Sequence, residues 1–260
     1  QRNPRRRLLN LNMFQAAHKI ANIADHLKAM QAMFTVEPPL AYAPSTTARV
    51  IVEAAAGVHP LLDVNIDTEE RLIRASSTLL ESFYHEVNAT RQLPTDRFPD
   101  AVAEAERRLS NLVKLAEHSG IEVRRQANGK PTGVCWGGAT NMRAVPYENK
   151  SNLIKATFGD YPALYQMGSG VAHSMSWMLA DNARVTADGP PAVVYTSDPY
   201  SNGAAAVVAI AAVEAVIAAF GRYMGFDPEE VLVPYRRRRE ALDRFMNEYG
   251  ARRVLTTGRL

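Results

Sequence analysis

Cysteine is almost absent from this chain of 260 residues, which contains only Cys135. A single thiol cannot form an internal disulfide framework, and it cannot supply a cysteine-based zinc site. The lack of disulfides is typical of proteins in a reducing compartment, so we expect a cytoplasmic protein. The amino terminus, which begins with Gln1, also shows no signal-peptide pattern.

Recognisable metal and phosphate motifs are missing as well. His18 and His26 lie eight residues apart on a predicted helix, and neither has a Glu or His four residues away. Gly137 and Gly138 lack the Lys and Ser/Thr residues that complete a P-loop. We therefore expect neither a bound metal nor a cofactor.

Long aliphatic runs that would favour membrane insertion are lacking too. Two segments approach the length of a membrane span, 161–180 and about 203–220. The first contains Gln, His, Ser and Gly residues, and the second is rich in alanine and carries Glu214. We interpret both as buried helices of a soluble protein, with no membrane partner.

Helical periodicity runs through most of the chain. With capping residues and prolines as boundaries, it predicts helices over 8–34, 46–59, 67–89, 100–119, 151–158, 160–181, 201–223 and 227–249. Ser45 and Asp67 are the predicted caps of the second and third helices. Pro234 is expected to interrupt or kink the last helix.

The expected fold is all-α, a multi-helix bundle forming one domain over 1–260. A basic tail occupies 1–7, and the C-terminal helix within 226–260 is expected at the periphery. Long irregular insertions are predicted around 121–150 and 181–200, where helical periodicity is lost. Short β structure is possible in both, as a hairpin at Asn128-Gly129 and a strand over 192–196.

The most distinctive stretch lies between Asp160 and Asp181, because no charged residue separates these two aspartates. A surface helix would carry Lys, Arg or Glu on one side. We therefore predict that 160–181 is the central buried helix of the bundle. Gly168 and Gly170 within it are best explained by close helix packing, and a ligand approaching the backbone is the alternative.

Polar side chains share one ridge of this predicted helix, at spacings of four residues. They are Tyr165, Ser169, His173 and Trp177. The ridge is either a polar patch in the core or the wall of a pocket. His173 is correspondingly either a hydrogen-bonded core histidine or a functional group.

Charged candidates lie on two other helices. Arg49 and Glu53 are spaced for an ion pair in an otherwise apolar run, and burying Glu53 without a partner would be costly. The alternative is that Glu53 faces Arg71 or Arg74, at the start of the following helix. Those two arginines belong either to a solvated face or to a site for a bound anion.

Basic residues gather in two blocks, although the net charge is only +3 and the sequence pI is about 9.0. The first block is Arg2 with Arg5–Arg7, and the second is Arg236–Arg239. Solvated tails or helix faces are the usual explanation for such blocks. Contact with nucleic acid is the weaker alternative, because only Tyr235 supplies an aromatic ring nearby.

The order of features resembles an uncharacterised group of actinobacterial helical proteins related loosely to the HEPN bundles. The matching pieces are ARVIVEAAAGVHPLLD (48–63), EERLIRA (69–75) and YPALYQMGSGVAHSMSWML (161–179). The resemblance implies an α-helical bundle that forms homodimers. Many HEPN proteins are ribonucleases with an arginine five to seven residues before a histidine. No histidine here has that arginine, so the resemblance implies the fold and not the activity.

Three functions remain open at this stage. The first is a buried polar pocket around His173 that binds or acts on a small anionic ligand, with His173 and Glu53 as catalytic candidates. Its expected ligand-binding residues are Arg49, Arg71, Arg74, Tyr165 and Ser169. The second is a nucleic-acid-directed protein, and the third is a non-enzymatic dimeric interaction protein. Whether the chain is an enzyme is left undecided by its sequence.

Overall fold

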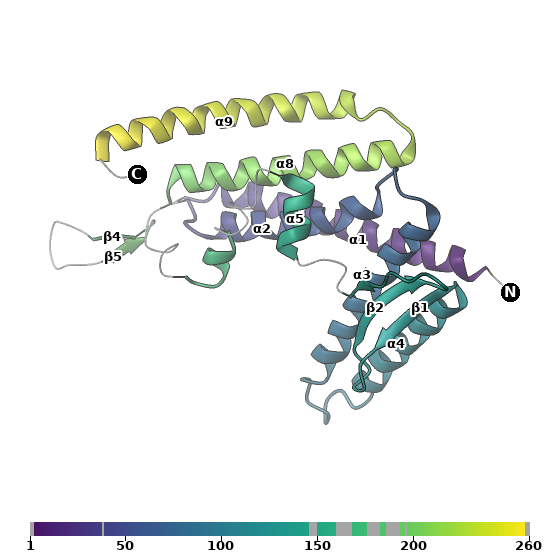
Figure 1. Cartoon of the computed structure of the whole chain (residues 1–260). Helices are drawn as coiled ribbons and strands as arrows, with labels where there is room; N and C mark the ends of the chain where they lie inside the picture. Colours follow the sequence, from purple (N-terminus) through teal and green to yellow (C-terminus); the bar gives the residue numbers. More distant parts are fainter. Residues whose placement is uncertain are drawn as a thin grey trace. The chain divides into compact units, whose positions relative to one another are not determined.

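The computed structural model describes residues 3–37, 39–145, 150–159, 168–175, 183–185, 193–195 and 197–257, with the backbone alone for 183–185, 193–195 and 250–257. The described chain is mostly helical, as the sequence predicts (Figure 1). Its contacts divide it into two compact units. The first contains residues 1–18 and 63–149, and the second contains 19–62 and 150–260. The expectation of one domain stays a prediction, because compact units of a chain can still fold together.

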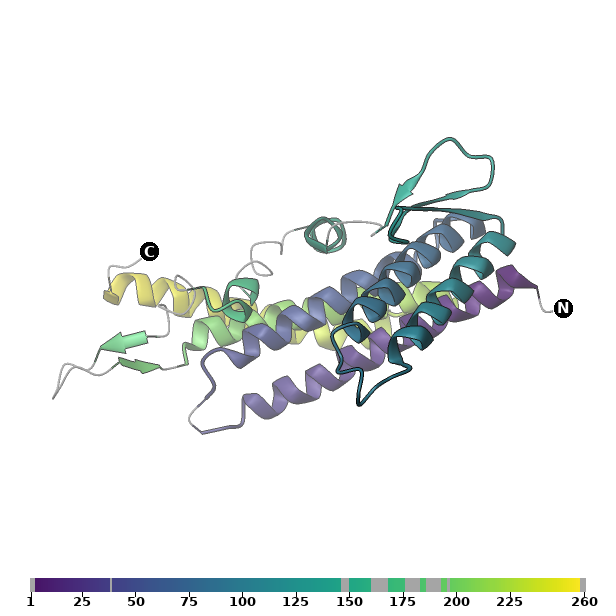
Figure 2. The same cartoon turned by 90° about the horizontal axis from the view of Figure 1, so that it is seen from below.

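The first unit is built on two helices that lie side by side, α3 (Thr68–Thr90) and α4 (Ala101–His118) (Figure 2). The predicted cap of α3 is confirmed, because the Asp67 side chain accepts a hydrogen bond from the Glu70 N–H at 2.7 Å. The amino-terminal half of α1 (Pro4–Met33) adds Leu8 to the core between them. The main buried members of that core are Leu8, Leu72, Leu79, Leu80, Leu112, Val113, Ile121 and Val134.

A three-stranded antiparallel sheet completes the first unit, in the order β1 (Ile121–Arg125), β2 (Pro131–Trp136) and β3 (Arg143–Ala144). The expectation of a long irregular insertion around 121–150 is therefore wrong over these strands. The hairpin at Asn128-Gly129 is confirmed, and Gly129 takes a left-handed φ of +81° in its turn. The sheet was hidden from pattern analysis because β2 is buried on both faces and lacks strict alternation.

Arg5 belongs to the first turn of α1, so the expected basic tail over 1–7 is wrong from residue 4 onward. Its Nε donates to the Ser119 carbonyl at 3.2 Å. Its guanidinium also lies 4.6 Å from the centre of the Trp136 ring, within the range of a cation–π contact. This arginine therefore fastens the start of α1 to the end of α4 and to β2.

Cys135 lies on β2 and is buried. Burial raises the pKa of its thiol, and the nearby carboxylate of Glu122 raises it further. The thiol therefore stays protonated near neutral pH, which makes it a poor nucleophile.

The second unit is organised around α8 (Pro199–Met224). Its other helices are α2 (Ala43–Val58), α5 (Lys150–Phe158) and α9 (Glu229–Thr257), with a 3₁₀ turn at His59–Leu61. A short antiparallel pair, β4 (Ala183–Val185) and β5 (Val193–Tyr195), confirms the strand expected within 192–196 and replaces irregular chain in part of 181–200.

The central buried helix of this unit is α8. It packs on α2 and on α9, which runs back along it (Figures 1 and 2). No residue from 201 to 221 is exposed. By length and composition α8 is also apolar enough to cross a membrane. In the structure, 44% of the most apolar stretch of α8 is buried.

The last helix is longer than the sequence predicts, because α9 continues through Gly250 to Thr257. Pro234 lies inside it without interrupting it. Leu232 and Met246 are buried, as expected for a helix packed along α8. This packing compensates for the hydrogen bond that Pro234 cannot make.

Glu214 is 9% exposed, on α8, and its charge is balanced by an arginine of the second basic block. Arg239 Nε lies 3.1 Å from both carboxylate oxygens. A second member of the block, Arg236, pairs with Glu229. Two of the four arginines in the block Arg236–Arg239 thus form ion pairs within the second unit.

We predict that Arg239→Ala lowers the free energy of unfolding by about 2–3 kcal/mol, because it leaves the Glu214 carboxylate buried without this partner. Urea denaturation followed by circular dichroism measures the loss. The exposed neighbour Arg238 is the matched control, and Arg238→Ala should change the free energy by less than about 0.5 kcal/mol. Equal losses in the two variants would contradict a specific role for the ion pair.

Candidate functional site

The predicted central helix over 160–181 ends early in its described part. Residues 168–172 are helical, and Ser174 then takes a left-handed φ of +53°. The Ser174 N–H donates to Val171 at 3.0 Å and the Met175 N–H to Gly170 at 2.8 Å. This pair of bonds is a Schellman helix end, which usually has glycine where this chain has Ser174.

His173, Ser174 and Met175 are all exposed, so the prediction that they lie in a buried helix is wrong. In its described part, the uncharged segment includes a helix end whose side chains are exposed. Tyr165 and Trp177, the first and last members of the predicted ridge, lie outside the described residues. Because the helix ends after residue 172, the predicted ridge does not continue past His173 as part of the same helix.

Gly168 packs directly against α2. A Cβ at this position would lie 3.0 Å from the Ser45 carbonyl oxygen and 3.3 Å from the Arg49 Cβ. Both distances are shorter than ordinary van der Waals contact. Close packing, the preferred interpretation of the glycine step, is thus supported at Gly168.

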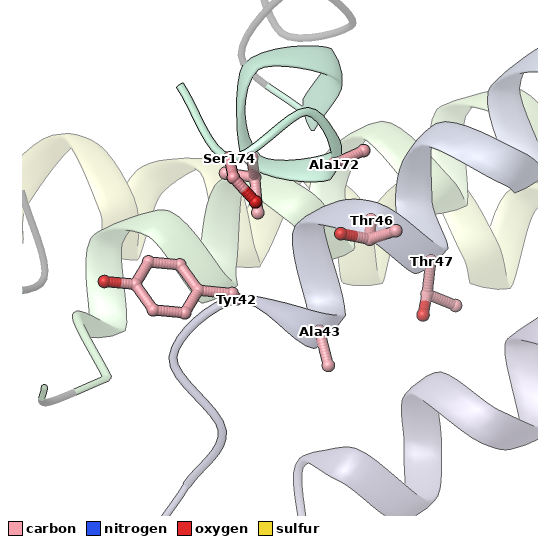
Figure 3. Close-up of a pocket in the computed structure, with 7 residues that line it drawn as sticks. Tyr42, Ala43, Thr46, Thr47, Ala172 and Ser174 are labelled. Carbon is pink, nitrogen blue, oxygen red and sulfur yellow. The ribbon is translucent and has the colours of Figure 1, made fainter. Parts of the chain in front are cut away.

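A hollow of about 570 Å³ lies beside this contact, between the start of α2 and the turn that follows residue 170 (Figure 3). In Figure 3 Ser174 projects toward the first turn of α2, which carries Thr46. The described lining combines hydroxyl groups with small apolar side chains: Tyr42, Ala43, Thr46, Thr47, Val171, Ala172 and Ser174. The size is within the range of small-molecule sites.

The first turn of α2 has an open amino terminus. The predicted cap, Ser45, is wrong, because the helix begins at Ala43 and Tyr42 occupies the cap position without a side-chain capping bond. The first amides of a helix have no acceptor inside it, and since Pro44 has no N–H, the amides concerned in this turn are those of Ala43 and Ser45. No acidic residue lies in this turn, so its partial positive charge is not offset by the helix itself.

Thr47 is 7% exposed and belongs to the lining of the hollow. Its hydroxyl donates to the Met33 sulfur at 3.6 Å. A thioether is a weak acceptor, so this hydroxyl can exchange that contact for a stronger one at little cost.

Arg49 and Glu53 form the ion pair that the sequence predicts, with Arg49 Nε 2.7 Å from Glu53 Oε1. Lys150 of α5 adds a second cation at 3.5 Å from Glu53 Oε2. Both glutamate oxygens are therefore engaged within the second unit. The Cβ of Arg49 also lies against Gly168, so the residue that forms the ion pair also packs on the short helix.

Arg71 and Arg74 lie in the first unit. Arg74 Nε is 2.8 Å from Glu70, and Glu70 also pairs with Arg143 of β3. Arg71 donates to the backbone carbonyl of Asp63 at 2.6 Å. The two arginines therefore stabilise the start of α3. Their convergence with Glu53 or with His173 stays a prediction.

His173 sits between two lining residues, Ala172 and Ser174, but does not belong to the described lining itself. Ser169 is half-buried on the same short helix. Sequence reasoning missed Tyr42, Thr46 and Thr47. The signal for them was the hydroxyl-rich stretch YAPSTT at 42–47, directly before a strongly apolar helix.

Among the described residues, no group of three or more His, Cys, Asp or Glu side chains could hold a metal ion. The comparisons with known proteins do not identify the chain. No family model matches the chain, and no curated protein or solved structure matches it.

We predict that Gly168→Ala lowers the free energy of unfolding by about 1–3 kcal/mol, because the added methyl group must push the short helix away from α2. Ser169→Ala is the matched control in the same helical turn and should be neutral or slightly stabilising. Urea denaturation measures both. A Gly168→Ala protein as stable as the control would show that the contact with Ser45 is not tight.

We predict that His173→Ala changes the free energy of unfolding by less than about 0.5 kcal/mol, because the side chain is exposed. Val171→Ala, two residues earlier and buried, should cost about 1–3 kcal/mol in the same measurement. A large loss in His173→Ala would restore the interpretation of a core histidine.

Proposed function

We propose that this protein binds a small anionic ligand in the hollow between the first turn of α2 and residues 171–174. The observation that carries the proposal is the hollow itself, with its hydroxyl groups beside an open helix amino terminus. Such a terminus favours negative charge through its amide groups and its dipole. The described lining contains no carboxylate that would repel an anion.

We propose binding only, and whether the protein also catalyses a reaction is left open. His173 is next to the hollow in the chain, and its role as a general acid or base stays a hypothesis. Glu53 is held by Arg49 and Lys150, so in this proposal it supports the wall of the hollow. The HEPN-like resemblance also stays a proposal, and the binding argument does not depend on it.

The test measures thermal stability and ligand-observed NMR with a panel of small carboxylates, sulfate and phosphate esters. At least one anion should raise the melting temperature. Ala172→Phe should abolish the effect, because Ala172 is an exposed lining residue and a phenyl ring there fills the hollow. Ala241→Phe, at an exposed position on α9, is the control and should bind normally. Binding that survives Ala172→Phe would place the ligand elsewhere.

Nucleic-acid binding is a second candidate, favoured by the exposed Arg237 and Arg238 of α9. Arg236 and Arg239 are engaged by Glu229 and Glu214, so only half of the block is available. This candidate predicts RNA or DNA affinity that falls steeply with added salt and is lost in the double variant Arg237→Glu/Arg238→Glu.

A further inference from the structure

The sheet of the first unit has an edge that the proposed function does not use. The strand order is β1-β2-β3, and β1 lies beside β2 (Figure 1). Among the described strands, only β2 pairs with β1. The side of β1 that points away from β2, called the free edge below, is therefore a row of backbone groups available for pairing with another strand.

Hydrogen bonds at both ends of β1 show which of its residues point to the free edge. The Gly137 N–H donates to the Gly120 carbonyl at 2.8 Å, and the Gln126 N–H donates to the Lys130 carbonyl at 2.9 Å. In an antiparallel pair, residues whose backbone groups point at the partner strand alternate with residues whose groups point away. The even-numbered residues of β1 therefore point their backbone groups at β2, and the odd-numbered residues point theirs at the free edge.

The backbone groups at the free edge are those of Ile121, Val123 and Arg125. Side chains alternate between the two faces of a sheet, and Ile121 and Val123 pack on the core of the unit. Glu122 and Arg124 therefore extend from the opposite face, and both are exposed. The free edge thus carries one acidic and one basic side chain on the same face, on either side of Val123.

We propose that β1 pairs with β1 of a second copy of this chain, in antiparallel orientation, about a two-fold axis at Val123. In this register Glu122 of each copy lies opposite Arg124 of the other copy. Val123 exchanges backbone hydrogen bonds with its own equivalent, and Ile121 does so with Arg125 of the other copy. The pairing joins two three-stranded sheets into one continuous sheet.

Charge complementarity selects a second copy as the occupant and fixes the register. Glu122 and Arg124 meet as a non-hydrogen-bonded pair, in which side chains of neighbouring strands lie closest. Opposite charges at such positions stabilise a strand pair, and like charges destabilise it. A shift by two residues would place Glu122 opposite Glu122, or Arg124 opposite Arg124. Charged side chains on an edge usually prevent association, but these two prevent the shifted registers and permit one.

The size of the contact determines how strong the pairing is. β1 contains five residues, so the interface formed by its edge is small. Small interfaces are typical of weak and transient association. We therefore expect a dimer that forms at high protein concentration and dissociates on dilution.

Sedimentation equilibrium of the full chain over a series of concentrations tests the proposal. The wild type should dimerise reversibly. Glu122→Arg and Arg124→Glu should each raise the dimer dissociation constant about tenfold or more, because each reversal places like charges opposite each other. Arg97→Glu, at an exposed position in the loop before α4, is the matched control and should dimerise as the wild type does.

The same two positions allow a rescue. The double variant Glu122→Arg/Arg124→Glu should dimerise again, because the exchange restores opposite charges at both pairs. A mixture of the two single variants should form heterodimers, since one copy then has two basic side chains and the other has two acidic ones. Circular dichroism checks that each variant is folded, and if one reversal variant does not fold, the other tests the same contact.

Three results would overturn the proposal. A wild-type protein that stays monomeric at every concentration has no such pairing. A dimer that neither reversal weakens is formed by another surface. A dimer that the reversals weaken and the exchange does not restore would show that Glu122 and Arg124 do not lie opposite each other.

Discussion

The second unit depends on the enclosure of one helix, α8, by α2 and α9. Alanine and glycine allow neighbouring helices to approach α8 closely, and a Cβ at Gly203 would overlap the sulfur of Met246 on α9. The same enclosure makes a carboxylate within it expensive, since a buried charge must be compensated. Arg239 provides that compensation from α9. The orientation of the arginine block is thus a consequence of core packing.

The parts of the fold that were predictable from sequence are those marked by local signals. Asp67 caps α3 through its own side chain, and the apolar periodicity of α2 and α4 places both helices within a few residues. Only the hairpin turn of the three-stranded sheet was predicted, because β2 is largely buried and does not alternate between polar and apolar residues. A strand buried on both faces leaves little periodic trace in a single sequence.

The candidate site was predictable only in pieces. The pair of Arg49 and Glu53 follows from helical spacing, and Gly168 follows from the need for close approach. The hollow does not, because it depends on where the short helix ends, and that end rests on the left-handed conformation of Ser174. Serine rarely occupies this conformation, so no residue pattern announces it. The lack of charge over 160–181 predicts a buried helix, whereas residues 173–175 form an exposed helix end.

The contact between Gly168 and Ser45 has a consequence for what the hollow can accept. The short helix and α2 meet there through the Ser45 backbone and the Arg49 Cβ, and no flexible part of a side chain lies between them. Their separation near the contact is therefore set by the main chain, and a change of rotamer cannot widen it. In the proposed ligand-binding role, this fixed separation favours a flat guest over a bulky one near the contact.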